Sequence, residues 1–341
     1  MARDWLLVET LGGEPAVVAL GRQLKNLVPI SAFLRRNPNL AAIRTAIAET
    51  MQTHQSLVSI TPKSDRVIRT EPILMSDGRM HGVHVWSGPA TAEPLERPIP
   101  GPLKWDLTAG VATDTPESLA NNGKNPEVED TDGRAFAENW PSRDLKPNES
   151  KVLALAVNPE PGRTLCATWD GTDWQGNPIR VGFVARNSVE PGPDGRDHLI
   201  ARGMNWRADP ADQAESGDGL AERILHGLAQ PGVHRALIDL NNWTLLKWLD
   251  EPCPFYDWRR SARGAPRIYP GDESRLDVMT AEFADGCASA VLRMPGHGDT
   301  WVPVHVTVNR VQLEKETYAG LVSLRLPTDA EVAEAQLPDV G

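Results

Sequence analysis

Two histidines three positions apart, His81 and His84, come closest in this sequence to a metal-binding pair. They lie in the stretch SDGRMHGVHVW, whose alternating apolar residues after an Asp-Gly turn predict a β-strand. Successive side chains of a strand point to opposite faces, so residues three apart are expected on opposite sides of the sheet. We therefore expect two separate, half-exposed sheet histidines and no shared metal ion.

Three other side chains could support hydrolytic or isomerase chemistry. His297 lies in the segment PGHGDTW, His305 in the apolar run VPVHVTV, and Cys253 between two prolines in PCPFYDW. A reactive thiol needs an electropositive environment, and a run of arginines follows Cys253. No GxSxG nucleophile motif accompanies the histidines, however, and PGHGDTW is typical of a turn between strands. No catalytic residue is assigned, and a hydrolase or isomerase remains the alternative function.

Aromatic and basic residues supply the candidates for binding. The chain has 11 Trp against 3 Tyr and 5 Phe, and Trp offers a large contact area with one polar handle. The candidate pocket residues are Trp169, Trp174, Trp243, Trp248, Phe255, Trp258 and His305. The basic run WRRSARGAPR supplies candidates for contact with an acidic partner or a phosphate: Arg259, Arg260, Arg263 and Arg267. The alternatives are structural: Trp that fill small cores, and a solvated basic loop.

Cofactor and effector motifs are missing from the sequence. The three cysteines form no CxxC pair and offer no zinc framework. LGGEP lacks the Lys-Ser/Thr of a P-loop, and no GxGxxG follows an expected strand. Kinase, GGDEF and basic helix-turn-helix signatures are absent as well. The residues give no support for haem, flavin or metal, and we expect any output to pass through another protein.

Composition limits the partners and the compartment. The net charge is −11 and the isoelectric point about 5.3, which disfavours nucleic acid or an anionic membrane as the main partner. No apolar run is long enough to span a bilayer, and the N-terminus has no apolar core of a signal peptide. Unpaired cysteines fit a reducing compartment. We expect a cytoplasmic protein.

Two stretches that are rich in proline or in polar turn-forming residues divide the chain. PATAEPLERPIPGP is a stiff linker, and RADPADQAESGDG is polar and turn-rich. The expected domains are 1–98 including the linker, 99–215 and 216–330, followed by an acidic tail over 331–341. Each domain opens with short strands, continues with helices and closes with a three-stranded meander. This order predicts an α+β fold in which one antiparallel sheet carries helices on one face.

Some elements are expected at specific residues. Leu24–Leu34 reads as helical, Leu40–Met51 as a clearer helix capped by Asn39, and residues 272–288 as a third helix. Thr115-Pro116-Glu117 has the sequence of a helix start. Asn241-Asn242 suits a tight turn with positive φ, and Pro303 predicts an edge position or a bulge.

Two further features concern assembly and repetition. The segment DGLAERILHGLAQ has Leu220, Ile224 and Leu228 on one stripe, so this helix is expected to dock within the chain, with homodimer formation as the alternative. An Asp-Gly-Arg turn recurs at Gly78 and Gly195, and a third hairpin turn is expected near Glu316 at a similar step. The sequence therefore predicts three copies of one plan.

The plan resembles the PAS and GAF sensor domains. The resemblance is carried by the opening hairpins over 105–112 and 236–248, and by closing strands such as DGRMHGVHV, DGRDHLIARGMNW and YAGLVSLRL. The whole chain is similar to an actinobacterial, mycobacterial-type family built only of sensor domains, one GAF followed by two PAS. This resemblance implies a non-enzymatic cytosolic sensor or scaffold that integrates small-molecule or protein signals and relays them to a separate effector protein.

Overall fold

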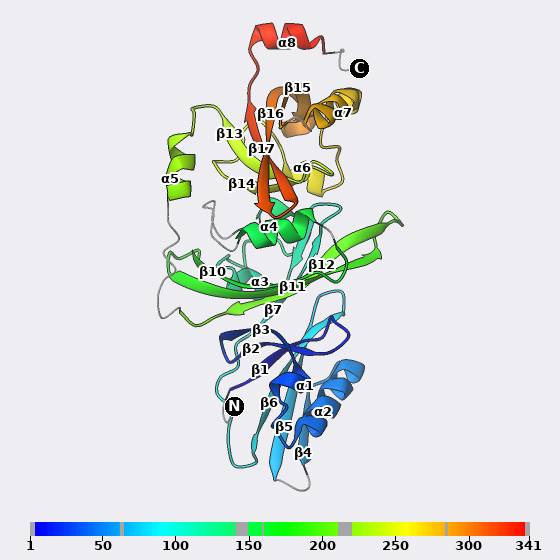
Figure 1. Cartoon of the computed structure of the whole chain (residues 1–341), viewed down its shortest axis with the longest axis vertical. Coiled ribbons are helices and arrows are strands. Elements are labelled where there is room, and N and C mark those ends of the chain that lie inside the picture. The colour runs from blue at the N-terminus through cyan, green and yellow to red at the C-terminus, as the bar shows by residue number, and fades with distance from the viewer. Residues whose placement is uncertain are drawn as a thin grey trace. The chain divides into compact units, whose positions relative to one another are not determined.

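The computed structural model describes residues 4–61, 65–138, 140, 149–158, 160–210, 220–283 and 286–337. Three antiparallel sheets follow one another along this part of the chain (Figure 1). The chain divides into two compact units. The first comprises Met1–Trp105, Thr113–Asp132 and Glu160–Ala214, and the second Asp106–Ala112, Gly133–Pro159 and Glu215–Gly341. Two segments of the predicted middle domain, Asp106–Ala112 and Gly133–Pro159, thus belong to the second unit.

The N-terminal domain is a six-stranded sheet of order β3-β2-β1-β6-β5-β4. Its strands are β1 (Leu6–Glu9), β2 (Ala16–Leu20), β3 (Gln23–Pro29), β4 (Leu57–Thr61), β5 (Arg66–Leu74) and β6 (Met80–Pro89). Helices α1 (Ile30–Phe33) and α2 (Leu40–Thr53) cover one face (Figure 1). The apolar stripe of α2 places Ile43 and Ile47 against Val83 and Val85 of β6, which forms the core.

The middle domain contributes a six-stranded sheet of order β10-β11-β12-β7-β8-β9. Its strands are β7 (Gly101–Asp106), β8 (Val111–Asp114), β9 (Arg134–Ala135), β10 (Thr164–Thr172), β11 (Pro178–Pro191) and β12 (Asp197–Arg207). The helices are α3 (Pro116–Asn121), η1 (Phe136–Glu138) and α4 (Glu149–Val157). The Thr115 hydroxyl accepts from the Ser118 N–H and caps α3, as the sequence predicts.

The C-terminal domain has a five-stranded sheet of order β14-β13-β17-β16-β15. Its strands are β13 (His234–Ile238), β14 (Leu245–Trp248), β15 (Cys287–Pro295), β16 (Trp301–Glu314) and β17 (Thr317–Arg325). Its helical elements are α5 (Leu220–Gly227), α6 (Arg259–Ala262), η2 (Pro270–Asp272), α7 (Glu273–Glu282), η4 (His297–Asp299) and α8 (Asp329–Ala335). In all three sheets the strand that comes first in the sequence lies beside the strand that comes last. The first two sheets have the same strand order, and the third repeats it with one outer strand fewer. The fold is α+β, and the sheets dominate.

The recurring hairpin turn is confirmed at all three positions. Gly78, Gly195 and Glu316 have φ of 81°, 77° and 62°, each in the turn before the last strand of its sheet. The prediction of an edge position for Pro303 is also confirmed. It pairs with Arg293 of β15, whereas pairing of β16 with β17 starts at His305, so no ladder bond needs the missing N–H.

Three helix predictions need correction. The expected helix over Leu24–Leu34 is strand β3 followed by the single turn α1, because Leu27 has φ of 49° and β3 pairs with β2. Asn39 precedes α2 but makes no side-chain cap bond. The third helix, α7, is shorter than expected and ends at Glu282.

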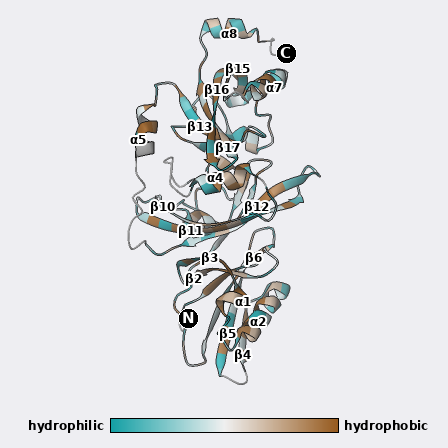
Figure 2. Cartoon of the chain, in the orientation of Figure 1, coloured by the Kyte–Doolittle hydropathy of each residue, from teal (hydrophilic) through white to brown (hydrophobic). Residues whose placement is uncertain are grey.

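The ends of the C-terminal domain also differ from expectation. Residues 331–335 of the expected tail belong to helix α8, which starts with a Thr328–Glu331 capping box. Residues 211–219 of the second predicted linker, including the expected domain boundary, lie outside the described residues. Ile224 of α5 and Leu228, the residue that follows this helix, are 51% and 63% accessible, and Figure 2 shows hydrophobic residues on α5. None of the described helices has the length and apolar content to cross a bilayer.

The two histidines of the opening motif do not lie as the spacing predicts. The pairing of β5 with β6 slips by one residue between Ile73↔Gly82 and Leu74↔Met80, which leaves His81 unpaired in a bulge. His81 then reaches Gly203 of β12, on the sheet face that His84 shares. Both side chains are buried, with 0% and 1% exposure, so the expected half-exposure and opposite faces are wrong.

Candidate functional site

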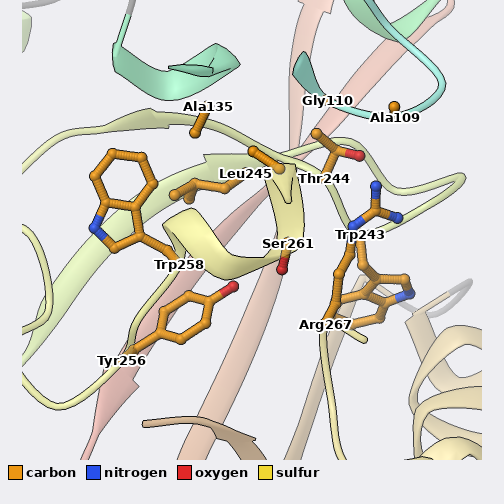
Figure 3. Close-up of a pocket in the computed structure, with 11 residues that line it drawn as sticks. Ala109, Gly110, Ala135, Trp243, Thr244, Leu245, Tyr256, Trp258, Ser261 and Arg267 are labelled. Atoms are coloured by element: carbon orange, nitrogen blue, oxygen red, sulfur yellow. The ribbon is translucent and has the colours of Figure 1, made fainter. Parts of the chain in front are cut away.

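A small pocket lies in the second compact unit, where the β13–β14 turn approaches α6 (Figure 3). Its cavity measures about 20 Å³, which is room for about one water molecule. The residues around it form what we call the C-terminal pocket: Ala109, Gly110, Ala135, Trp243, Thr244, Leu245, Tyr256, Trp258, Ser261, Ala262 and Arg267. Three predicted binding residues, Trp243, Trp258 and Arg267, come together here.

The β13–β14 turn shapes one wall of the pocket. The Asp239 carboxylate accepts from the Asn241 N–H at 2.9 Å, and the Asn242 side-chain oxygen accepts from the Thr244 N–H at 2.9 Å. These bonds place the positive φ on Trp243, at 59°, and not on the asparagines as the sequence predicts. A bulky residue in this conformation is strained, and such strain concentrates at functional sites.

One hydroxyl group of the pocket, Thr244 Oγ1, is buried without a hydrogen-bond partner. The Ser261 hydroxyl, by contrast, interacts with the Tyr256 hydroxyl. Thr244 is 6% exposed, and its methyl group would lie 2.6 Å from a Cβ at position 110. Gly110, with φ of 73°, permits that close approach. A buried polar atom without a partner costs about 1–3 kcal/mol, so the Thr244 hydroxyl is a site where an added partner would stabilise the domain.

One cation and one phenol complete the polar lining. The Arg267 guanidinium donates to the Asn242 carbonyl and thereby holds the β13–β14 turn. Burial lowers the pKa of Arg267, although Tyr256 and Asp239 partly offset the effect. Burial also raises the pKa of Tyr256 to about 12, so its hydroxyl keeps its proton at neutral pH. Figure 3 shows Trp258 and Tyr256 on one side of Ser261, with Trp243 and Arg267 on the other.

The other predicted aromatic residues lie away from the cavity. Trp248 is buried behind Trp258, with ring centroids 6.2 Å apart and the rings edge to face. Trp169 packs on Phe183 of β11 at 5.1 Å in the first unit. Trp174 is 59% exposed in the turn between β10 and β11. Phe255 is half-buried beside the C-terminal core, with its ring 5.8 Å from that of His234.

The basic run does not form one patch. Arg259 pairs with Glu138 at 2.5 Å, and its guanidinium lies over the Trp258 ring. Arg260 pairs with Asp299 at 2.7 Å. Arg263 is exposed at the C-terminal end of α6. Only Arg267 lines the C-terminal pocket.

The residues considered for catalysis are arranged in other ways. His305 Nε2 lies 3.2 Å from Ser289 Oγ and 3.6 Å from Glu331 Oε1, so the hydroxyl and the carboxylate contact the same ring nitrogen. A nucleophilic triad needs them on opposite nitrogens. His297 Nε2 contacts the Pro254 carbonyl in a turn. Burial raises the pKa of the Cys253 thiol to about 11, which keeps it in the weakly nucleophilic protonated form.

A second buried polar cluster lies in the first unit, where the N-terminal and middle sheets pack together. Arg202 of β12 donates to both oxygens of Glu190 at 2.8 Å and to Asp77 at 2.7 Å. Its guanidinium also lies 3.3 Å from His81 Nε2, while His81 Nδ1 is 2.8 Å from the Gly203 carbonyl. Desolvation lowers the pKa of His81 to about 4. We call this group the Arg202 cluster; the polar groups named here all have partners.

Apolar packing surrounds the Arg202 cluster. Leu7, Val18 and Ile73 of the N-terminal sheet meet Met204 and Trp206 of the middle sheet in one buried group. Among the described residues, no group of three or more His, Cys, Asp and Glu side chains is placed to hold a metal ion.

Sequence reasoning missed Thr244, Ser261 and Tyr256. They are close in sequence to Trp243 and Trp258, and that proximity to two Trp was the available signal. Their burial around the cavity depends on how the turn and α6 meet, which no local pattern encodes.

Family models cover almost the whole chain. Models described as the Rv3651-like N-terminal, middle and C-terminal domains match residues 4–96, 99–208 and 218–335. The chain is also similar to an uncharacterized protein from Mycobacterium tuberculosis whose crystal structure is known. The identity is 69%, the TM-score is 0.90, and the match covers 98% of this chain and 99% of that chain.

More distant structures give weaker matches. A sensory box histidine kinase/response regulator from Burkholderia thailandensis is 17% identical with a TM-score of 0.23, over 38% of this chain and 92% of that chain. A similarity this low carries no argument about function. A comparison with the curated proteins gives no match.

Proposed function

The chain belongs to the Rv3651-like family, and from that premise we propose that it is a non-enzymatic cytosolic sensor or scaffold that binds a small molecule in its C-terminal pocket. In this proposal the three domains are of the GAF/PAS type, one GAF followed by two PAS. Support comes from the strand order: the first two sheets share it in full, the five-stranded third sheet repeats it without one outer strand, and in each the opening hairpin lies beside the closing strand.

One observation carries the proposal: the C-terminal pocket holds a buried hydroxyl without a partner, that of Thr244, next to a strained Trp. Small-molecule sites are concave and mostly apolar, with a few convergent polar groups. Trp243, Trp258 and Leu245 supply the apolar wall, and Thr244 with Ser261 supply the polar groups. A ligand that bonds the Thr244 hydroxyl binds the folded domain and gains its unpaired hydrogen-bonding capacity.

The proposal extends to partners and cofactors. The signal passes to a separate effector protein by a shift in the population of two conformations of the β13–β14 turn. Ile224 of α5 and Leu228, both exposed, form the proposed contact for a second copy or for that effector. The proposal assigns no haem, flavin, metal, nucleic-acid or membrane partner.

A metabolite screen by thermal shift tests the proposed function, with the full chain and its Thr244→Val variant side by side. A pocket ligand raises the melting temperature of the wild-type protein, because it binds only the folded state. The shift should shrink in Thr244→Val, which removes one hydroxyl with little change of shape. Thr280→Val on the exposed face of α7 is the matched control and should respond as wild type.

Two results would contradict this proposal. One is a screen without any stabilising compound. The other is a set of stabilising compounds whose effect is the same in Thr244→Val as in the wild-type protein.

A further inference from the structure

The polar groups of the C-terminal pocket are arranged around a single guanidinium. Arg267 lines the cavity together with the unpartnered Thr244 hydroxyl, and both can donate a hydrogen bond. Donors that converge on one space favour an acceptor, and a guanidinium favours an acceptor that carries negative charge. The Thr244 side chain is more than nine-tenths buried, so its free donor is shielded from competing solvent.

The shape of the cavity narrows the choice of anion. The volume of about 20 Å³ leaves little room beside Arg267. A carboxylate is flat and carries one charge, whereas a phosphate is tetrahedral and carries up to two. The Asp239 carboxylate interacts electrostatically with Arg267 and would oppose a doubly charged ligand more strongly. The indoles of Trp243 and Trp258 favour a planar body behind the charged group.

A ligand larger than the cavity can enter only if the β13–β14 turn opens, and the bond between Arg267 and this turn offers a way to open it. Arg267 bonds the carbonyl of Asn242, the residue that precedes the strained Trp243. A carboxylate at Arg267 competes for that donor and removes one of the bonds that hold Trp243 at positive φ. The turn then relaxes, and the indole moves away from the cavity.

Taking these observations together, we infer that the C-terminal pocket binds a planar monocarboxylate, whose carboxyl group accepts hydrogen bonds from Arg267 and Thr244 and frees the β13–β14 turn. This inference rests on the proposed function and adds the ligand class and the bond through which the ligand frees the turn.

Benzoate and its neutral isostere benzamide test the ligand class by calorimetric titration of the full chain. Benzoate should bind and benzamide should not. Arg267→Met should weaken benzoate binding about tenfold or more, because a charge-assisted hydrogen bond is lost. Thr244→Val should weaken it about threefold to tenfold. Arg263→Met removes an exposed arginine from the same loop and should bind benzoate as wild type.

Arg267→Lys is the second variant if Arg267→Met fails to fold. Lysine keeps the charge but has no planar fork, so benzoate affinity should fall while the preference over benzamide remains. Failure of benzoate to bind overturns the inference, as does equal binding of benzamide or an unchanged affinity in both Arg267 variants. If other compounds then bind in a Thr244-dependent way, only the ligand class is wrong. If no compound does, the proposed function fails as well.

Discussion

The Arg202 cluster and the C-terminal pocket bury polar groups in opposite ways. In the first, one guanidinium has two carboxylates, a histidine and close apolar packing around it. In the second, the Thr244 hydroxyl has no partner and the turn that carries it is strained. Partnered polar groups fix how two sheets pack. Unpartnered ones lower the stability of the domain, and a ligand can supply the missing hydrogen bond. The comparison favours a structural role for the first region and supports the binding site proposed in the second.

The largest expected effect comes from a partnered pair in the same unit as the pocket. Lys247 Nζ lies 2.5 Å from Glu149 Oε2, and the two side chains are 1% and 2% exposed. Lys247→Met should lower the free energy of unfolding by about 3–5 kcal/mol, because it leaves a buried carboxylate without its cation. Urea unfolding followed by circular dichroism measures this. A loss under about 1 kcal/mol would show that partnering does not distinguish the two kinds of site.

A somewhat smaller loss is expected in the Arg202 cluster, whose acids are partly exposed. Arg202→Met should cost about 3 kcal/mol in the same urea experiment, since Glu190 and Asp77 lose their shared cation. Arg196→Met, at an exposed arginine of the β11–β12 turn, is the control and should change stability by less than about 0.5 kcal/mol. Equal effects of the two substitutions would contradict the structural role of the cluster.

The next largest effect is expected from acid, which should lower the free energy of unfolding of the first unit. Burial lowers the pKa of His81 to about 4 and of His84 to about 3, so both are neutral in the folded state. The unfolded chain binds their protons from about pH 6.5 downward, and stability is lost as the pH falls from there toward the folded pKa values. Each histidine should cost about 2 kcal/mol between pH 7 and pH 5.

Unfolding free energies from urea titrations at several pH values measure that slope. His84→Phe should remove about half of it, whereas His54→Gln, at an exposed histidine, should leave it unchanged. A flat profile between pH 7 and pH 5 would mean that the two histidines are not buried as neutral groups.

The smallest effect is expected in the pocket, and with the opposite sign. Thr244→Val replaces an unpartnered hydroxyl by a methyl group of similar shape and should leave stability unchanged or raise it by about 1 kcal/mol. The melting temperature of the ligand-free protein measures this. A loss of more than about 1 kcal/mol would indicate that the hydroxyl has a partner and that the two regions do not differ in this respect.

The elements that the sequence predicts well depend on local patterns. Helix α2 follows from the spacing of Ile43 and Ile47, the α3 cap from Thr115, and the hairpin turns from the repeated Asp-Gly-Arg. Each of these features is decided by neighbours within a few residues.

The features that the sequence does not predict depend on distant segments. The faces of His81 and His84 are set by a slip in pairing with β5, and strand β3 is set by its partner β2. In the pocket, the Trp and Arg267 could be named in advance. The unpartnered Thr244 hydroxyl could not, because its burial arises only where the turn, α6 and Gly110 meet.

Hydrogen exchange with and without benzoate tests the central claim most directly. The Trp243 N–H bonds the Asp239 carbonyl at 2.8 Å, and the Asp239 N–H bonds the Thr244 carbonyl at 2.9 Å. If the C-terminal pocket is the ligand site, benzoate should speed exchange at these two amides as the turn is freed and leave β11 and β12 around Arg202 unchanged. Unchanged exchange at residues 239–244, or a change confined to the Arg202 cluster, would contradict it.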